Sequence, residues 1–173
     1  MSISTKVVPW SELRHASGTC NSMPIAFQEL CSADKAIREH GYWQIDNHVI
    51  LQGDLYEPAP FVITGLLGCL TTDPPSREEI YNLLVEFAYG HTSDNELARA
   101  TLESLAQGLD LYWRDLRNTV GQTKVHVANL ILGLSNHIRL DSRKLQSALK
   151  AESNQEVRVL LLEAAEQNQF LQT

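Results

Sequence analysis

Apolar side chains recur along this chain every three or four residues, which is the period of an α-helix, and strand-like alternation is nearly absent. The pattern therefore predicts an all-α protein. The expected helices span residues 11–16, 23–31, 34–51, 60–70, 76–89, 97–118, 123–138, 141–152 and 154–168. Gly108 lies inside the segment 94–118, and leaves open whether that segment is one kinked helix or two.

Polar residues mark several helix starts. Asp141 is a natural N-cap for the helix that follows it. Ser76 with Glu79, and Ser93 with Glu96, have the spacing of a capping box, in which each side chain binds a backbone N–H of the other residue. We therefore expect these serines to begin their helices.

Three stretches resemble one another and align without gaps: EEIYNLLVEFA (78–88), KVHVANLILGLS (124–135) and QEVRVLLLEAAE (155–166). Their shared apolar positions superpose Ile80 with Val127 and Val157, Leu83 with Leu130 and Leu160, Leu84 with Ile131 and Leu161, and Phe87 with Leu134 and Ala164. On a helical wheel these positions lie on one face, which we expect to be buried.

Each of these stretches follows another expected helix, and a single helix pair cannot bury its apolar face alone. The repeat favours a short right-handed α-solenoid of about four HEAT-like helix pairs. It would form one domain over residues 1–173, with a short N-terminal helical segment at 1–22 and repeats from about residue 23. A generic helical bundle is the alternative.

The polar side of the repeated helices is a candidate binding face, because the second helices of a solenoid line one concave surface. We expect partner contacts from Glu79, Asn82, Glu86, His126 and Asn129. Gly133, Glu156, Val159 and Glu163 occupy further positions on this side. Simple solvation is the alternative explanation for each residue.

The charge is negative and uneven. The chain has 14 Lys and Arg against 21 Asp and Glu, a net charge of −7. Nine acids and three bases between residues 73 and 115 account for −6 of it. This charge disfavours binding of nucleic acid. It has two possible roles: to attract a basic protein partner, or to keep the protein soluble. In the first case Asp94, Glu96, Glu103 and Asp110 would steer the partner.

Motifs that carry catalytic chemistry are absent from the sequence, including phosphate-binding loops, nucleophile elbows and His-Glu-x-x-His. Arg99 with Glu103, and Asp110 with Arg114, have the spacing of surface ion pairs one helical turn apart. Three cysteines without Cys-x-x-Cys spacing favour reduced thiols over a disulfide framework or a zinc site. We expect no enzyme activity, cofactor or metal.

The polar stretch DNHVILQGDLYEPAPFV (46–62) is expected to be a joint between helices, with Gly53 in the turn, rather than an active site. Trp10, Trp43 and Trp113 are expected to fill gaps in the core or to anchor a partner. Tyr42 and Trp43 are the best candidates for both roles, because adjacent helical positions point to different faces. The sequence has neither a membrane-spanning run nor a secretory signal, so we expect a cytoplasmic protein.

The chain resembles a group of bacterial HEAT-repeat proteins. WSELRHASG (10–18) is similar to their pattern W..L.HAYG, and ILQGDLYEPAPFV (50–62) to HQG..Y.A....PFL, with Leu51 in place of the histidine. The helix after Asp34 and NQEVRVLLLEAAEQ (154–167) extend the resemblance over most of the chain. The resemblance implies a small immunity protein of a polymorphic toxin system.

The leading hypothesis is therefore a non-catalytic immunity protein, monomeric when free, that binds a basic toxin domain and occludes its active site. Two alternatives stay open. One is a HEAT-like scaffold or regulator of an endogenous complex. The other is a HEAT-like DNA-repair glycosylase, which the acidic middle segment disfavours because a duplex needs a basic channel.

Overall fold

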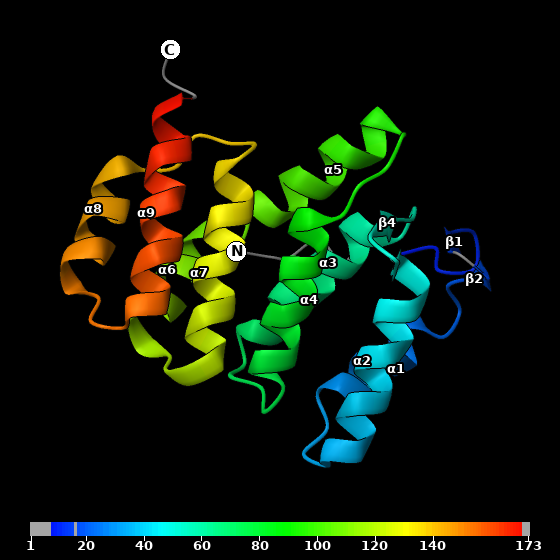
Figure 1. Ribbon diagram of the computed structural model, residues 1–173. Helices are drawn as coiled ribbons and strands as arrows, with labels where there is room; N and C mark the ends of the chain where they lie inside the picture. Colours follow the sequence, from blue (N-terminus) through cyan, green and yellow to red (C-terminus); the bar gives the residue numbers. More distant parts are fainter. Residues whose placement is uncertain (1–7, 16, 171–173) are drawn as a thin grey trace, which may run out of the picture.

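The computed structural model describes residues 8–15 and 17–170, and helices dominate them, which confirms the all-α prediction (Figure 1). The helices are α1 (Met23–Leu30), α2 (Lys35–Val49), α3 (Ala59–Leu70), α4 (Arg77–Tyr89), α5 (Asn95–Ala106), α6 (Leu109–Asn118), α7 (Gly121–Ser135), α8 (Ser142–Ala151) and α9 (Gln155–Phe170). Among the described residues, no helix has both the length and the apolar character that crossing a membrane requires.

Four helices form a row. Figure 1 shows α9, α7, α4 and α2 from left to right, and each contacts its neighbour in the row. The other helices pack beside this row, with α1 on α2, α3 on α4, α6 on α7 and α8 on α9. Helix α5 packs mainly on α3. Helix α7 therefore lies between α4 and α9 and is covered on both sides.

The core lies along the repeated register. Of the superposed apolar positions, all are buried except Leu160, which is partly buried and packs against the core. Gly133, expected on the polar side, is buried instead. A Cβ atom there would lie 3.1 Å from the Cβ of Ala88 and 3.2 Å from the ring of Tyr89, so a small residue lets α7 approach α4 closely.

The segment 94–118 is two helices, α5 and α6, which meet at Gly108. The carbonyl oxygen of Leu105 accepts two hydrogen bonds at 3.0 Å, one from the backbone N–H of Gly108 and one from the Tyr112 hydroxyl, so the end of α5 is tied to α6. A Cβ atom on residue 108 would lie 2.4 Å from the Tyr112 ring, which explains the glycine.

The helix expected at 11–16 is wrong: the described residues form a turn and a short hairpin, β1 (Arg14–His15) and β2 (Gly18–Thr19). Ala16 and residues 1–7 lie outside the described residues, so the helical segment predicted at 1–22 is described in part. Tertiary bonds hold the hairpin, because the N–H of Arg14 donates to the carboxylate of Glu57 at 2.8 Å. Helical periodicity cannot anticipate a contact so distant in sequence.

The helix expected at 34–51 ends at Val49, and a second hairpin follows, β3 (Ile50–Leu51) and β4 (Asp54–Leu55). Gln52 and Gly53 form its turn with φ of 55° and 87°, a left-handed conformation that favours glycine. The backbones of Gly53 and Leu55 each hydrogen-bond to His91 at 2.8 Å. The polar stretch 46–62 is thus a joint that fastens the first helix pair to the end of α4.

The helix starts differ from the capping boxes expected. Asp141 caps α8 as predicted, because its carboxylate accepts from the N–H groups of Arg143 and Lys144 at 2.8 and 3.3 Å. Ser76 precedes α4 but makes no capping hydrogen bond. Helix α5 is capped by Asp94, not Ser93, because the Asp94 carboxylate accepts from the N–H groups of Glu96 and Leu97.

Candidate functional site: an acidic groove

A groove of about 540 Å³ crosses the row of helices and gathers part of the predicted binding face. It is lined by Lys35, Glu39, Tyr42 and Trp43 of α2, Glu78, Glu79 and Asn82 of α4, and His126 of α7. We call these residues the acidic groove. It brings together three predicted contact residues, Glu79, Asn82 and His126, from two helices.

An aromatic pair forms one wall of the acidic groove. The rings of Tyr42 and Trp43 meet edge to face with centroids 5.0 Å apart. The side-chain amide of Asn82 donates to the Tyr42 hydroxyl at 2.7 Å, which fixes Tyr42 against α4. Trp43 remains 55% exposed, and tryptophan is a residue enriched at protein interfaces. Trp43 is therefore available to stack on a side chain of another molecule.

The two adjacent glutamates of α4 differ in their pairing. Glu79 is half-buried, and its carboxylate accepts from Nε of Arg38 at 3.2 Å, so it joins α2 to α4. Glu78 is exposed and takes part in no ion pair of the described residues. The negative charge available to a partner therefore comes from Glu78 more than from Glu79.

Negative charge accumulates beside the aromatic wall, where Asp46 of α2 and Glu86 of α4 come together. Burial, with a further contribution from Glu86, raises the pKa of Asp46. Burial raises the pKa of Tyr42 to about 12; Asp46 and Glu86 add to the rise, and the hydrogen bond from Asn82 opposes it. An approaching cation would relieve this repulsion between carboxylates.

His126 lies at the α7 end of the acidic groove. Burial lowers its pKa, and the carboxylates of Glu78 and Glu86 oppose that effect. The imidazole is consequently neutral at pH 7, where it does not offset the charge of the neighbouring carboxylates. Asn129, one turn further along α7, accepts a hydrogen bond from the Tyr89 hydroxyl through Oδ1 at 2.9 Å.

The four predicted steering residues do not line the acidic groove. Asp94 caps α5, and Glu96 lies in the first turn of that helix. Glu103 pairs with Arg99 at 2.6 Å, as its spacing predicted. Asp110 pairs with Lys144 of α8 at 2.7 Å, and this hydrogen bond lowers the pKa of Asp110.

The expected ion pair between Asp110 and Arg114 is therefore not formed: Asp110 pairs with Lys144, and Arg114 with Asp115. The Arg114 guanidinium binds Asp115, 3% exposed in its residue surface, at 2.8 Å. Asp115 also accepts from the Tyr81 hydroxyl at 2.7 Å and from Arg77. This cluster joins α4 to α6 and lines neither the acidic groove nor the cavity described next, so its chemistry is structural.

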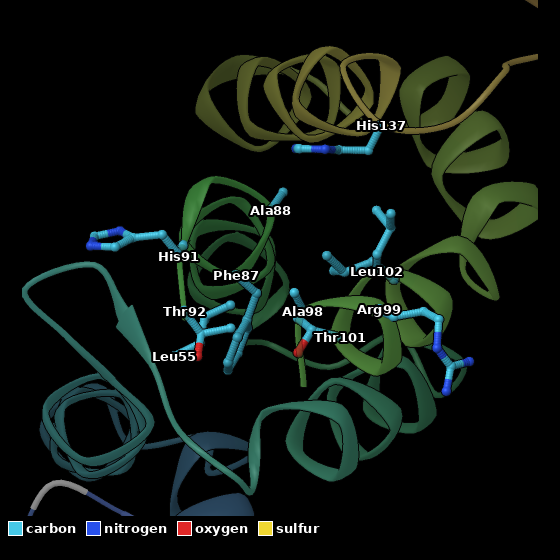
Figure 2. A pocket seen from close by; sticks show the side chains of 12 residues that line it. Leu55, Phe87, Ala88, His91, Thr92, Ala98, Arg99, Thr101, Leu102 and His137 are labelled. Carbon is cyan, nitrogen blue, oxygen red and sulfur yellow. The ribbon is translucent and has the colours of Figure 1, made fainter. Parts of the chain in front are cut away.

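A second hollow, which the sequence did not indicate, lies where α4, α5 and the end of α7 meet (Figure 2). Its volume is about 330 Å³, and its walls are mainly apolar, with Phe87, Leu102 and Leu105 among them. Figure 2 shows the His91 ring and the Arg99 guanidinium directed away from its centre. The cavity could hold an apolar group.

Most polar side chains around this apolar cavity are already engaged or shielded, whereas His137 is exposed. His91 pairs with Asp54 at 3.0 Å, and Arg99 pairs with Glu103. The Thr101 hydroxyl is buried and, in the described part of the chain, has no hydrogen-bond partner. No acid–base pair is therefore arranged around a common point, as general catalysis would need.

Sequence reasoning missed Glu78 and Glu39 as groove residues, because it assigned roles by helical register alone. The adjacent Tyr42 and Trp43 did carry a signal, since their different faces suggested one buried and one exposed aromatic ring. Across residues 8–15 and 17–170, no group of three or more His, Cys, Asp or Glu side chains is placed to hold a metal ion. Comparison with known proteins gives no assignment: no family model, curated protein or solved structure matches the chain.

Proposed function

We propose that the protein is a non-catalytic protein-binding module whose acidic groove docks a basic segment of a protein partner. The observation that carries the proposal is the exposed Trp43 ring on α2 in the same groove as the Glu78 carboxylate of α4, which forms no ion pair among the described residues. The carboxylates of Asp46 and Glu86 lie beside the same aromatic wall. Aromatic rings bind guanidinium and ammonium groups through their faces, and nearby carboxylates complete the charge match.

The architecture proposed for this module is a short right-handed HEAT-like α-solenoid. The row α2, α4, α7 and α9 supports it, because each of these helices follows a first helix, and together they present the groove side of the molecule. The third unit departs from a simple pair, since both α5 and α6 precede α7.

A basic partner fits the charge of this surface better than a nucleic acid does. In the acidic groove Glu39 pairs with Lys35 at 3.5 Å and Glu79 with Arg38 at 3.2 Å, so Glu78 supplies the remaining negative charge, beside Asp46 and Glu86. Phosphates would meet repulsion here, which also disfavours the glycosylase alternative. Complementary charge would raise the association rate and make it dependent on salt.

The specific role proposed is that of a cytoplasmic immunity protein, which rests on the resemblance of residues 10–18 and 50–62 to bacterial HEAT-repeat proteins. The toxin would be a basic domain, and the bound protein would cover its active site. A single helical domain can do so without any catalytic group of its own.

The test is binding and protection with the toxin domain encoded beside the gene for this chain. Co-expression should rescue growth, and the purified proteins should associate with a rate that falls as salt rises. The double variant Glu78→Lys/Glu86→Lys should slow association at least tenfold at low salt and flatten its salt dependence. Glu79 is left intact, because reversing it would also repel Arg38.

The charge-matched control is Glu166→Lys, an exposed position on α9 outside the acidic groove, paired with a second exposed reversal, Glu12→Lys, which lies outside both the groove and the predicted steering residues. This control should retain most of the association rate. Unchanged kinetics in the groove variant would remove the acidic groove from the interface. Absence of both binding and protection would reject the immunity role and favour the scaffold alternative, which a basic endogenous partner would support.

A further inference from the structure

Two of the three cysteines lie together although 38 positions separate them in the sequence. Their Sγ atoms are 3.3 Å apart. Cys31 follows α1 as its C-cap, and Cys69 lies in the last turn of α3. Both thiols are half-buried, whereas Cys20 is fully buried.

The local backbone allows the two sulfur atoms to come closer. A disulfide needs a sulfur–sulfur distance of about 2 Å, so the atoms must approach by little more than an ångström. Cys31 is the C-cap of α1, its N–H donating to the carbonyl oxygen of Phe27 at 3.2 Å, and the short turn to α2 begins directly after it. A side-chain rotation at Cys31 with a small shift of this turn can supply the movement.

We propose that Cys31 and Cys69 are a reversible redox pair, which hydrogen peroxide closes to an intramolecular disulfide and a dithiol reductant reopens. The Cys31 thiolate attacks one peroxide oxygen, the O–O bond breaks, and the released hydroxide takes up a proton to give water. The Cys69 sulfur then attacks Sγ of the Cys31 sulfenic acid and displaces hydroxide, which leaves as water with the Cys69 proton. The two sulfurs lose two electrons, and the peroxide gains them.

The order of the two steps follows from the surroundings of Cys69. Burial raises the pKa of Cys69 to about 12, and the neighbouring Cys31 thiol adds to the rise. Cys69 is therefore a poor first nucleophile and serves as the resolving thiol, because its fixed position beside Cys31 compensates for its low thiolate fraction. Reduction reverses the exchange as the dithiol becomes its own cyclic disulfide.

The disulfide would fasten the first helix pair to the second. At present this junction is held by side-chain contacts, among them the Phe27 ring packed over Gly65 and the ion pair of Arg38 with Glu79. The acidic groove crosses the same junction, with Trp43 on α2 and Glu78 on α4. Oxidation would thus fix the distance between the α2 and α4 walls of the acidic groove. An effect of oxidation on partner binding rests on the proposed function, whereas formation of the disulfide does not.

The experiment maps the thiols of the full-length protein. Reduced protein is treated with hydrogen peroxide under native conditions, then denatured and alkylated, and its intact mass and peptides are measured. We expect a product that carries a single alkyl group, on Cys20, whose mass is otherwise that of the reduced chain less two hydrogen atoms, and a peptide linking Cys31 to Cys69. Treatment with dithiothreitol should restore three alkylated thiols. Three free thiols after oxidation, or linkage through Cys20, would overturn the proposal.

Thermal unfolding provides a second readout. The closed loop should raise the melting temperature of the oxidised protein by roughly 5 to 15 °C over the reduced form. Cys31→Ser and Cys69→Ser should lose this shift, and Cys20→Ala should keep it. If a serine variant fails to fold, the peptide map of the wild-type protein still decides the question. A disulfide that is mapped but causes no thermal shift would refute the fastening of the helix pairs. Neither measurement uses the partner protein, so both outcomes are independent of the proposed function.

Discussion

Two carboxylates of the same helix, those of Asp110 and Asp115 in α6, have different surroundings. Asp115 is buried and receives hydrogen bonds from Tyr81, Arg114 and Arg77. Asp110, five residues earlier, is exposed and meets Lys144 at the surface. The first carboxylate holds two helices together, and the second is screened by water.

Removing the Asp115 carboxylate should therefore be costly. Asp115→Ala leaves the buried Tyr81 hydroxyl without its acceptor and removes one acceptor each from the guanidinium groups of Arg77 and Arg114, although Arg77 keeps Asp73. The variant should lower the free energy of unfolding by about 3–5 kcal/mol. Urea denaturation followed by circular dichroism measures the change. Asp110→Ala is the matched control and should leave the midpoint nearly unchanged; equal effects of the two variants would contradict the structural role of Asp115.

Glu152 gives the stability a defined pH dependence. Burial acts to raise its pKa, but the N–H of Asn154 and the ammonium group of Lys124, 3.0 Å away, outweigh it, and the pKa is lowered. The unfolded chain thus takes up the proton first as the pH falls. Glu152 contributes stability above its ordinary pKa and loses this contribution as the pH drops through the lowered value.

The variant Glu152→Gln should therefore be less stable than the wild type at neutral pH. The difference should shrink as the pH falls below about 4.5 and vanish once the pH lies below the lowered pKa of the folded wild type, where both chains are uncharged at this position. Urea midpoints measured across this range test it, with the exposed Glu166→Gln as control. A difference that is constant with pH would show that Glu152 acts through its shape and not its charge.

At the scale of the element, the helix starts show which of the N-capping patterns in the sequence form capping hydrogen bonds. Asp34, Asp94 and Asp141 each accept N–H groups of the first turn that follows. Ser76 has the expected sequence pattern, but its hydroxyl is buried and, within the described residues, unpaired. Glu79, which the sequence pattern pairs with Ser76, instead forms an ion pair with Arg38 of α2. A tertiary ion pair therefore takes the place of the local capping box.

The two kinds of helix start should respond differently to alanine. Asp94→Ala removes a formed cap and should lower the free energy of unfolding by about 1 kcal/mol. Ser76→Ala removes a hydroxyl that is buried without a partner, and should leave stability unchanged or raise it slightly. Thermal melts of both variants distinguish the cases. A loss at Ser76 as large as that at Asp94 would mean that its hydroxyl does cap α4 in solution.

At the scale of the whole molecule, stability is distributed along the row of helices. Helix α7 contacts both α4 and α9, and its core positions are fully buried. Helices α1 and α2 contact chiefly each other. They meet the rest through side chains, among them Phe27, Arg38 and Tyr42, and through the β3–β4 hairpin bonded to His91. Elements with fewer buried neighbours open at lower free energy.

Hydrogen exchange should therefore follow the row. We expect the backbone amides of α4 and α7 to exchange most slowly, and those of α1 and α2 to exchange at least tenfold faster under native conditions. Mass spectrometry of peptides from the exchanged protein measures both. The reduced protein is the state to compare, because the disulfide proposed between Cys31 and Cys69 would slow exchange in α1. Uniform protection would indicate that the molecule unfolds as one unit.

The helices and their buried faces could be predicted from sequence because they depend on local periodicity. The positions of Ile80, Val127 and Val157 illustrate this, since each recurs in a matching register and all are buried. The N-terminal hairpin could not be predicted in this way, because Glu57 holds it from far along the chain. The split at Gly108 was left open because the decisive contact is the packed ring of Tyr112.

By itself, the sequence determined that the chain is helical, where most helices lie, which faces are apolar, and that the surface is acidic. Periodicity and composition fix these properties, since they are sums over neighbouring residues. Tertiary structure alone decided that Glu79 is paired while Glu78 is not, that Trp43 stands exposed beside them, and that Cys31 reaches Cys69. Such pairings depend on which helices become neighbours, and a helical wheel contains no information about the helix that will face it.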